Sequence, residues 1–254
     1  MIDVLTVCLI GAAAGCLGSL MISKRISLIA GPIGHLAFPG VAIALLYELN
    51  PFIGALLAIL LGSLFMWAMR NLTPLPLETI AGITFVAGVA LGLIFLPMKG
   101  AEEAIVGDVS KIGLEDLAFA APIAFIALVF MALHYKKLVL ANLSEELAKS
   151  MKIDTKVYEL AYLAIIALIV AAEVKIVGGL LTIAMIILPA ASAYNLANSM
   201  KLYISLSTIL GVLEAIIGMA LYRLLAIPAG PAIIVVSTTI FIFSIAIGSF
   251  RSAH

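Results

Sequence analysis

Residues 4–22, which read VLTVCLIGAAAGCLGSLMI, decide the fold class of this chain. No charged side chain occurs anywhere in this stretch. A helix needs about 20 consecutive apolar residues to cross a bilayer, whereas a membrane-spanning strand shows about ten residues that alternate between apolar and polar. The stretch has the first pattern and therefore predicts a transmembrane helix.

Eight further apolar runs follow the first. They cover residues 26–49, 51–69, 77–96, 117–133, 157–172, 177–197, 202–225 and 228–250. The run 157–172 is short and the run 26–49 is interrupted by Gly31, Pro32 and Pro39, so one of these two is expected to be a bent or partial span. The sequence thus predicts an all-α, polytopic membrane protein with eight or nine transmembrane helices, in one domain over residues 1–254.

The composition excludes a soluble protein. Of the 254 residues, 65% are apolar and 11% are charged, whereas soluble domains have about 45–50% and about 25%. The formal net charge is zero and no long run of basic residues occurs, which argues against a nucleic-acid partner. The two cysteines, Cys8 and Cys16, form neither a disulfide framework nor a paired metal motif.

The distribution of Lys and Arg predicts the orientation in the membrane. If the N-terminus lies outside and all nine runs span, ten of the 14 basic residues fall on the cytoplasmic side. The other four are Lys99, Lys111, Lys175 and Arg223. Cytoplasmic loops are enriched in Lys and Arg, so we expect an outer N-terminus and, with nine spans, a cytoplasmic C-terminus in the plasma membrane.

The chain carries no motif of an enzyme. It has no Gly-x-x-x-x-Gly-Lys-Ser/Thr loop, so it cannot itself bind and hydrolyse ATP in that way. His-Glu-x-x-His, Gly-x-Ser-x-Gly and Cys-x-x-Cys are absent too. We therefore expect a transport subunit without a bound cofactor.

Two ionisable residues lie near the middle of predicted spans, and both are candidates for an ion site. His35 is ten residues after Arg25, and Glu214 is thirteen after Lys201. Ionisable groups at this depth are costly and rare unless they face a cavity, a partner or a transported ion. The alternative for each is structural: an imidazole or a carboxylic acid that forms a hydrogen bond between helices.

The neighbourhood of His35 favours the functional interpretation. Helix-loosening residues stand on both sides of the imidazole, in Gly31-Pro32-Ile33-Gly34 before it and in Pro39-Gly40 after it. Transporters place substrate and ion sites at such interrupted helices near the midplane. A neutral imidazole is also a common ligand for zinc, manganese and iron.

A polar segment of about residues 136–156 is the longest predicted cytoplasmic stretch. It includes Ser144-Glu145-Glu146-Leu147-Ala148, where acidic residues suit the first turn of a short helix. Such a helix could dock a partner protein. A solvated loop explains the same residues equally well.

Several of these stretches resemble the transmembrane permeases of ABC importers for zinc, manganese and iron. The resemblance is colinear and covers nearly the whole chain. It rests on residues 34–42 (GHLAFPGVA), 78–82 (ETIAG), 106–109 with 114–117, 144–148 (SEELA), 177–193 and 227–233 (IPAGPAI).

The resemblance implies a complex with several partners. These are a second permease, either another copy of this chain or a similar protein, two ATP-hydrolysing ABC subunits, and an extracytoplasmic metal-binding protein. It implies that Glu145, Glu146, Leu147 and Ala148 belong to a coupling helix in the ATPase cleft, and that His35 contacts the transported metal.

One position departs from the pattern of this family. The family usually has Asp four residues before the histidine, and this chain has Gly31 there. Mn(II) prefers oxygen ligands, so either the metal is softer, another acid substitutes, or the substrate differs. Glu214 is our candidate for the substitute acid.

Two alternative functions stay open on the sequence. One is a secondary transporter driven by a proton or sodium gradient, with Glu214 as the proton-carrying acid. The other is an ABC permease for a substrate that is not a metal, as the loss of the acid at Gly31 would allow.

Overall fold

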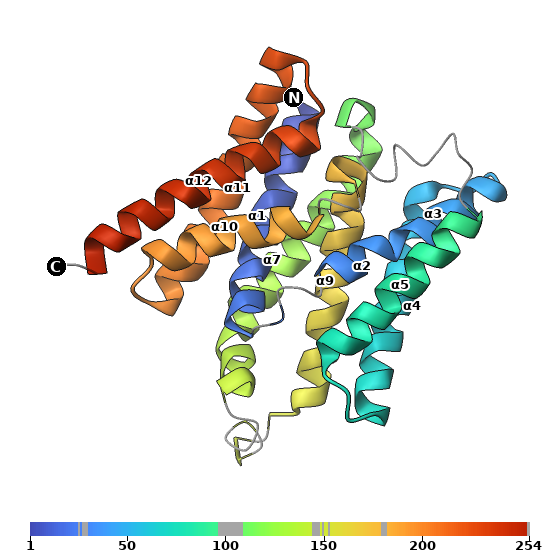
Figure 1. Ribbon diagram of the computed structural model, residues 1–254, viewed down its shortest axis with the longest axis horizontal. Coiled ribbons are helices and arrows are strands. Elements are labelled where there is room, and N and C mark those ends of the chain that lie inside the picture. The colour runs from blue at the N-terminus through green and yellow to red at the C-terminus, as the bar shows by residue number, and fades with distance from the viewer. Residues whose placement is uncertain are drawn as a thin grey trace.

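The computed structural model describes residues 1–24, 26, 30–95, 109–143, 148, 150–151, 153–178 and 182–252. These residues form a bundle of helices (Figure 1). The elements are α1 (Ile2–Ser23), α2 (Ala30–His35), α3 (Ala37–Leu46), α4 (Pro51–Leu72), α5 (Leu77–Phe95), the 3₁₀ turn η3 (Val109–Lys111), α7 (Leu114–Leu143), α9 (Thr155–Val177), α10 (Thr182–Leu196), α11 (Met200–Leu225) and α12 (Ala229–Ser252).

Each of the nine predicted runs corresponds to an apolar helical segment. Six helices are long and apolar enough to cross a membrane, and three shorter apolar segments cover Gly31–Ala44, Leu77–Gly92 and Thr182–Leu196. The run 26–49 is the interrupted one: α2 and α3 have six and ten residues, about 9 and 15 Å of helix. The run 157–172 instead lies in a helix of 23 residues.

Local sequence explains where several helices begin and end. The Asn50 side chain accepts a hydrogen bond from the Phe52 amide, and Pro51 occupies the first helical position of α4. Asp154 accepts from the amides of Lys156 and Val157 at the start of α9. Helix α9 ends at Gly178, whose φ of 77° favours glycine.

The bounds of three runs differ from the prediction. Helix α9 continues past Ala172 to Val177, and α10 covers Thr182–Leu196. Helix α7 continues to Leu143, so the first part of the expected coupling segment 136–156 is helical and continuous with a span. A prediction from hydropathy ends a helix at the first charged residues. The observed helix can continue beyond them, because its backbone hydrogen bonds continue and a lysine side chain can reach the interface.

Helix α1 lies at the centre of one group of helices and packs against α7, α10 and α11. It is apolar all round, as expected of a helix with no solvent-facing side. A Cβ on Gly11, Gly15 or Gly18 would lie closer than 3.0 Å to a backbone oxygen of α11 or α10. Small residues thus bring these helix backbones into direct contact.

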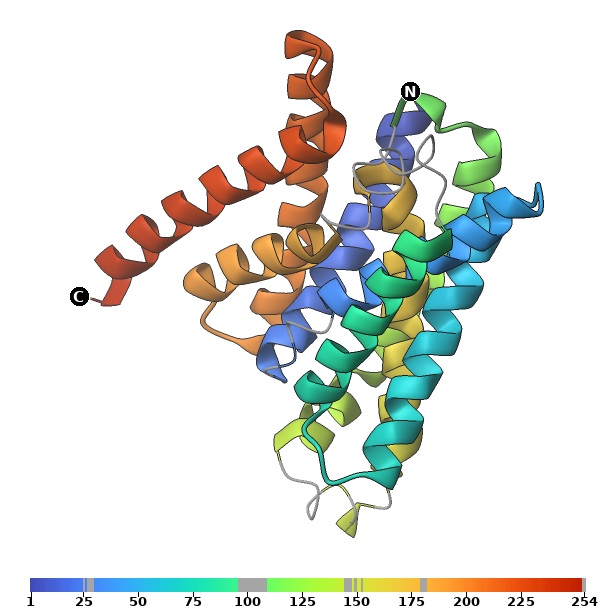
Figure 2. The ribbon, with the colours of Figure 1, turned by 45° about the vertical axis from the view of Figure 1, so that its right-hand side comes forward.

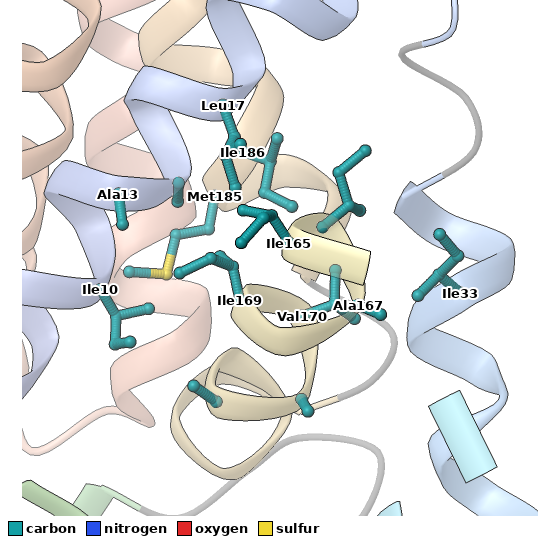
Figure 3. Packing of buried hydrophobic residues seen from close by; sticks show 14 of the residues in the cluster. Ile10, Ala13, Leu17, Ile33, Ile165, Ala167, Ile169, Val170, Met185 and Ile186 are labelled. Carbon is teal, nitrogen blue, oxygen red and sulfur yellow. The ribbon is translucent and has the colours of Figure 1, made fainter. Parts of the chain in front are cut away.

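A second group consists of α3, α4 and α5, at the right of Figure 1. Figure 2 shows these three helices side by side. Helix α9 packs directly on α4, and α2 packs on both α5 and α9. In Figure 3, Ile165 and Ile169 of α9 lie among side chains of α1 and α10, while Ala167 and Val170 lie toward Ile33 of α2. Helices α2 and α9 therefore connect the two groups.

Candidate functional site

His35 is the last residue of α2, directly before the break that separates α2 from α3. The imidazole is half-buried. Its centroid lies 4.7 Å from the Phe85 ring of α5 and 5.2 Å from the Phe38 ring. Its Nδ1 atom is buried and has no hydrogen-bond partner among the described residues. A buried nitrogen of this kind normally has a partner, so this atom is open to a ligand.

Glycines on the neighbouring helices make room for the chain around His35. A Cβ on Gly62 of α4 or on Gly88 of α5 would crowd the Leu36 side chain. Gly40 of α3 and Gly54 of α4 meet so closely that a Cβ on either would overlap the other backbone. Helices α3 and α4 are therefore in direct backbone contact just after the break, and α4 and α5 pack closely around Leu36 at the break itself.

Glu214 lies on α11 and is 2% exposed. Its Oε1 atom has no hydrogen-bond partner among the described residues. The Ser237 hydroxyl of α12 lies near the carboxyl group and donates its own hydrogen bond to the Ile233 carbonyl. One helical turn further along α11, Gly218 contacts Ile233 of α12. The carboxyl group therefore lies between α11 and α12.

The structure does not bring His35 and Glu214 together within one copy of the chain. Helix α2 packs mainly on α5, α9 and α10, whereas α11 packs on α1, α10 and α12. Among the described residues, no group of three or more His, Cys, Asp or Glu side chains could hold a metal ion. The described residues of one copy therefore do not by themselves form a metal site at His35.

Most of the predicted coupling residues lie outside the described residues. This applies to Glu145, Glu146 and Leu147. Ala148 is described and fully buried.

Glu173 is a buried acid that the sequence reasoning missed. It lies in the last part of α9, is 0% exposed, and has no hydrogen-bond partner for either carboxylate oxygen among the described residues. The predicted run stopped at residue 172, which placed Glu173 at a membrane surface. The signal that could have found it is the apolar Ile176-Val177 pair that follows and extends the helix.

Two basic residues, Lys24 and Arg70, meet side chains of α9 at one end of the bundle. Arg70 of α4 forms an ion pair with Glu159 of α9, and the Lys24 ammonium lies 4.9 Å from the centroid of the Tyr162 ring. Burial lowers the pKa of Lys24 to about 8, and the nearby Arg70 charge adds to this effect. At the opposite end, Arg223 donates a hydrogen bond of 2.6 Å to Asp3.

The sequence matches a known family over almost its whole length. The profile of the ABC 3 transport family matches residues 2–248. The manganese import system permease protein ScaB of Streptococcus parasanguinis is 30% identical, over 94% of this chain and 87% of its own length. The probable iron transport system membrane protein of Haemophilus influenzae is 28% identical, over 92% of this chain and 84% of its own length.

The fold also has a solved counterpart. The structure of PsaBC from Streptococcus pneumoniae in complex with Fab includes a chain with a TM-score of 0.84 and 27% sequence identity to this one. The match covers 95% of this chain and 89% of the other. The helical arrangement described above is therefore similar to one established by experiment.

Proposed function

Because this chain belongs to the ABC 3 transport family, we propose that it is the membrane-spanning permease subunit of an ATP-driven importer of a divalent metal ion. The resemblance inferred from the sequence and the all-α membrane fold are confirmed by the family match and by the structural similarity. The names of the relatives favour manganese or iron over zinc as the cargo. ATP hydrolysis belongs to a separate subunit, and this chain is not an enzyme.

His35 is the observation that carries the proposed site. The interrupted helix places one imidazole beside the break, and its Nδ1 atom has no partner among the described residues. A neutral imidazole can bind a first-row divalent cation through either nitrogen. We propose that His35 contacts the metal transiently while it crosses the membrane.

One histidine cannot complete a site for such a cation, so we propose that a second permease copy supplies the equivalent imidazole. The half-buried His35 ring packs on Phe85 of α5, and α5 has exposed apolar residues such as Ile83 and Val86. Two copies that meet along this helix would bring the two His35 side chains toward one central pathway.

The residues at positions 31 and 214 bear on which metal ion the protein transports, because each could supply or withhold an oxygen ligand. A Cβ at Gly31 would lie 3.3 Å from Cδ1 of Ile183, the flexible end of that side chain, so an aspartate there requires only a small shift. We expect Gly31→Asp to raise manganese transport relative to iron, because it restores an oxygen ligand one turn from His35. The role of Glu214 as substitute acid stays a hypothesis, which Glu214→Gln tests in the same assay.

The proposed assembly has two ABC ATPases on its cytoplasmic face and an extracytoplasmic metal-binding protein on the other. The coupling helix of Glu145, Glu146, Leu147 and Ala148 would enter the ATPase cleft. We further propose that residues 1–254 form one permease domain in the plasma membrane, with the N-terminus outside. The gathering of Lys24 and Arg70 at one end of the bundle supports this orientation.

Reconstitution with the ATPase partner in liposomes tests the proposal. The measurement is ATP hydrolysis and metal uptake with manganese, iron and zinc, for the wild type and for His35→Ala. We expect His35→Ala to lower metal-stimulated hydrolysis at least tenfold. His134→Ala is the matched control, because that histidine stacks on Phe130 in α7, away from the break. Equal stimulation of wild type and His35→Ala would remove His35 from the site.

The same preparation separates the alternatives. Uptake that continues without the ATPase and stops on addition of an uncoupler would indicate a gradient-driven transporter. ATP hydrolysis that no metal changes would indicate a different substrate.

A further inference from the structure

A slot lies between α1, α7 and α11, and none of its lining residues belongs to α2, the helix that carries His35. Its volume is about 420 Å³, within the range of about 300–1,000 Å³ that is usual for small-molecule sites. Apolar or weakly polar side chains form its wall: Cys16, Leu128, Met131, Ala132 and Ile204. We call this feature the α7–α11 slot.

The mouth of the slot is polar. Lys201, Ser205 and the Tyr135 side chain line it together with the apolar wall. Lys201 and Ser205 are exposed. Lys201 is the second residue of α11, and it forms no ion pair within the described part of the chain.

The slot is at the basic end of the bundle. Gly11 of α1 meets Gly211 of α11, and Gly15 meets Ser207, so the two helices are antiparallel. Lys201 therefore lies toward the end of α1 that carries Lys24. In the proposed orientation this end faces the cytoplasm.

The distance from the basic end of the bundle to the deepest lining residues is close to the thickness of one leaflet. Cys16 is eight residues from Lys24, and Leu128 is eight residues from Lys136. At about 1.5 Å per residue, both lie about 12 Å from the basic end. Half of the hydrocarbon core is about 15 Å thick, so the slot spans most of the inner leaflet.

We propose that the α7–α11 slot binds an anionic phospholipid of the cytoplasmic leaflet, with an acyl chain along the apolar wall and the headgroup at Lys201. A phosphate would accept hydrogen bonds from the Lys201 ammonium and from the Tyr135 and Ser205 hydroxyls. Basic pockets between transmembrane helices on the cytoplasmic side bind anionic lipid headgroups in this way. The inference rests on the proposed orientation and not on the metal site.

Charge complementarity favours a lipid over a second copy of the chain. An apolar wall that ends in a lysine matches an amphiphile with an anionic head. A protein helix that filled the slot would cover Lys201 and would have to supply an acidic residue at its mouth.

The test measures lipid retention by native mass spectrometry. The full-length chain with its ATPase partner is placed in nanodiscs of phosphatidylcholine with 20% phosphatidylglycerol, then released into detergent. We expect about fivefold less bound phosphatidylglycerol for Lys201→Ala, the change expected for one lost lysine near an anionic headgroup. We expect a similar loss for Ala132→Phe, which fills the slot while Lys201 is kept. Lys156→Ala is the matched control, an exposed lysine at the same end on α9.

The outcomes separate the possible occupants. If Lys201→Ala and Lys156→Ala lose the same amount of bound phosphatidylglycerol, the lipid is attracted by the general positive charge of the surface, and the proposal is overturned. Retention of phosphatidylcholine as strong as that of phosphatidylglycerol would overturn the headgroup assignment. Intermolecular cross-linking through Ala132→Cys, in a chain whose Cys8 and Cys16 are replaced, would show that a second copy covers the slot and would overturn the proposal. Ordinary metal-stimulated ATP hydrolysis by each variant keeps the result separate from the proposed function.

Discussion

Glu173 is the most unusual residue in the described part of the chain. It is fully buried, and neither of its carboxylate oxygens has a described partner. An unsatisfied buried polar group costs about 1–3 kcal/mol of stability. Such a cost is retained at functional sites more often than elsewhere, so Glu173 is a candidate for a role in the transport cycle.

Replacement of Glu173 by leucine separates structure from function. We expect Glu173→Leu to raise the free energy of unfolding by about 1–3 kcal/mol, because the polar group is removed and the volume is nearly kept. Thermal unfolding in detergent, combined with metal uptake in liposomes, measures both effects. Higher stability with lost uptake would indicate a functional acid. Lower stability would contradict the prediction and indicate a partner for the carboxyl group.

At the same scale, sequence reasoning found His35 and Glu214 but not Glu173. His35 and Glu214 are surrounded by apolar residues on both sides, which is a local signal. Glu173 is close to Lys175, so the local pattern resembles the end of a span. Only the continuation of α9 to Val177 places Glu173 inside the bundle.

At the scale of elements, the α1–α11 contact depends on the absence of side chains. A Cβ on Gly211 would overlap the Gly11 backbone. We expect Gly211→Val to lower the free energy of unfolding by about 3 kcal/mol or more, because two helices must separate. Gly82→Ala on α5 is the control, since no atom lies within 4 Å of its Cβ position. It should be neutral or stabilising by up to about 1 kcal/mol. If Gly211→Val and Gly82→Ala change the thermal unfolding to the same extent, the close contact between α1 and α11 would be contradicted.

The basic end of the bundle predicts a pH dependence. Burial lowers the pKa of Lys24 from 10.5 to about 8 in the folded chain. Between these values the unfolded chain holds a proton that the folded chain has released, so the free energy of unfolding rises with pH across this window. A shift of this size corresponds to a gain on the order of 3 kcal/mol.

The comparison of wild type with Lys24→Met isolates this contribution. Unfolding is measured from pH 7 to pH 10.5 for both proteins. We expect the wild type to gain stability relative to the variant above pH 8. A difference that stays constant across this range would show that Lys24 has an ordinary pKa.

At the scale of the whole molecule, the described residues of one copy do not complete the proposed site. No described group of metal ligands exists within the chain, and the exposed apolar face of α5 is close to His35 through Phe85. A cysteine at Val86, which is 63% exposed, should therefore cross-link two copies in lipid after Cys8 and Cys16 are replaced.

A cysteine at Phe243 on α12 is the control for this cross-link. Phe243 has a similar exposed fraction of 65%, but its helix packs on α10 and α11 and not on α5. A dimer band for Val86→Cys alone, on a non-reducing gel, is the expected result. Cross-linking through Phe243→Cys alone would place the contact between copies on the other side of the bundle.

The membrane class, the nine apolar segments and the interruption at His35 can all be predicted from the amino-acid sequence. Each follows from properties of a few neighbouring residues, such as hydropathy, glycine and proline. Four features could be seen only in the folded chain: the central place of α1, the separation of His35 from Glu214, the burial of Glu173, and the slot between α7 and α11. The physical reason is that a helix in lipid is apolar on every face, so its sequence carries little information about which face meets protein and which meets lipid.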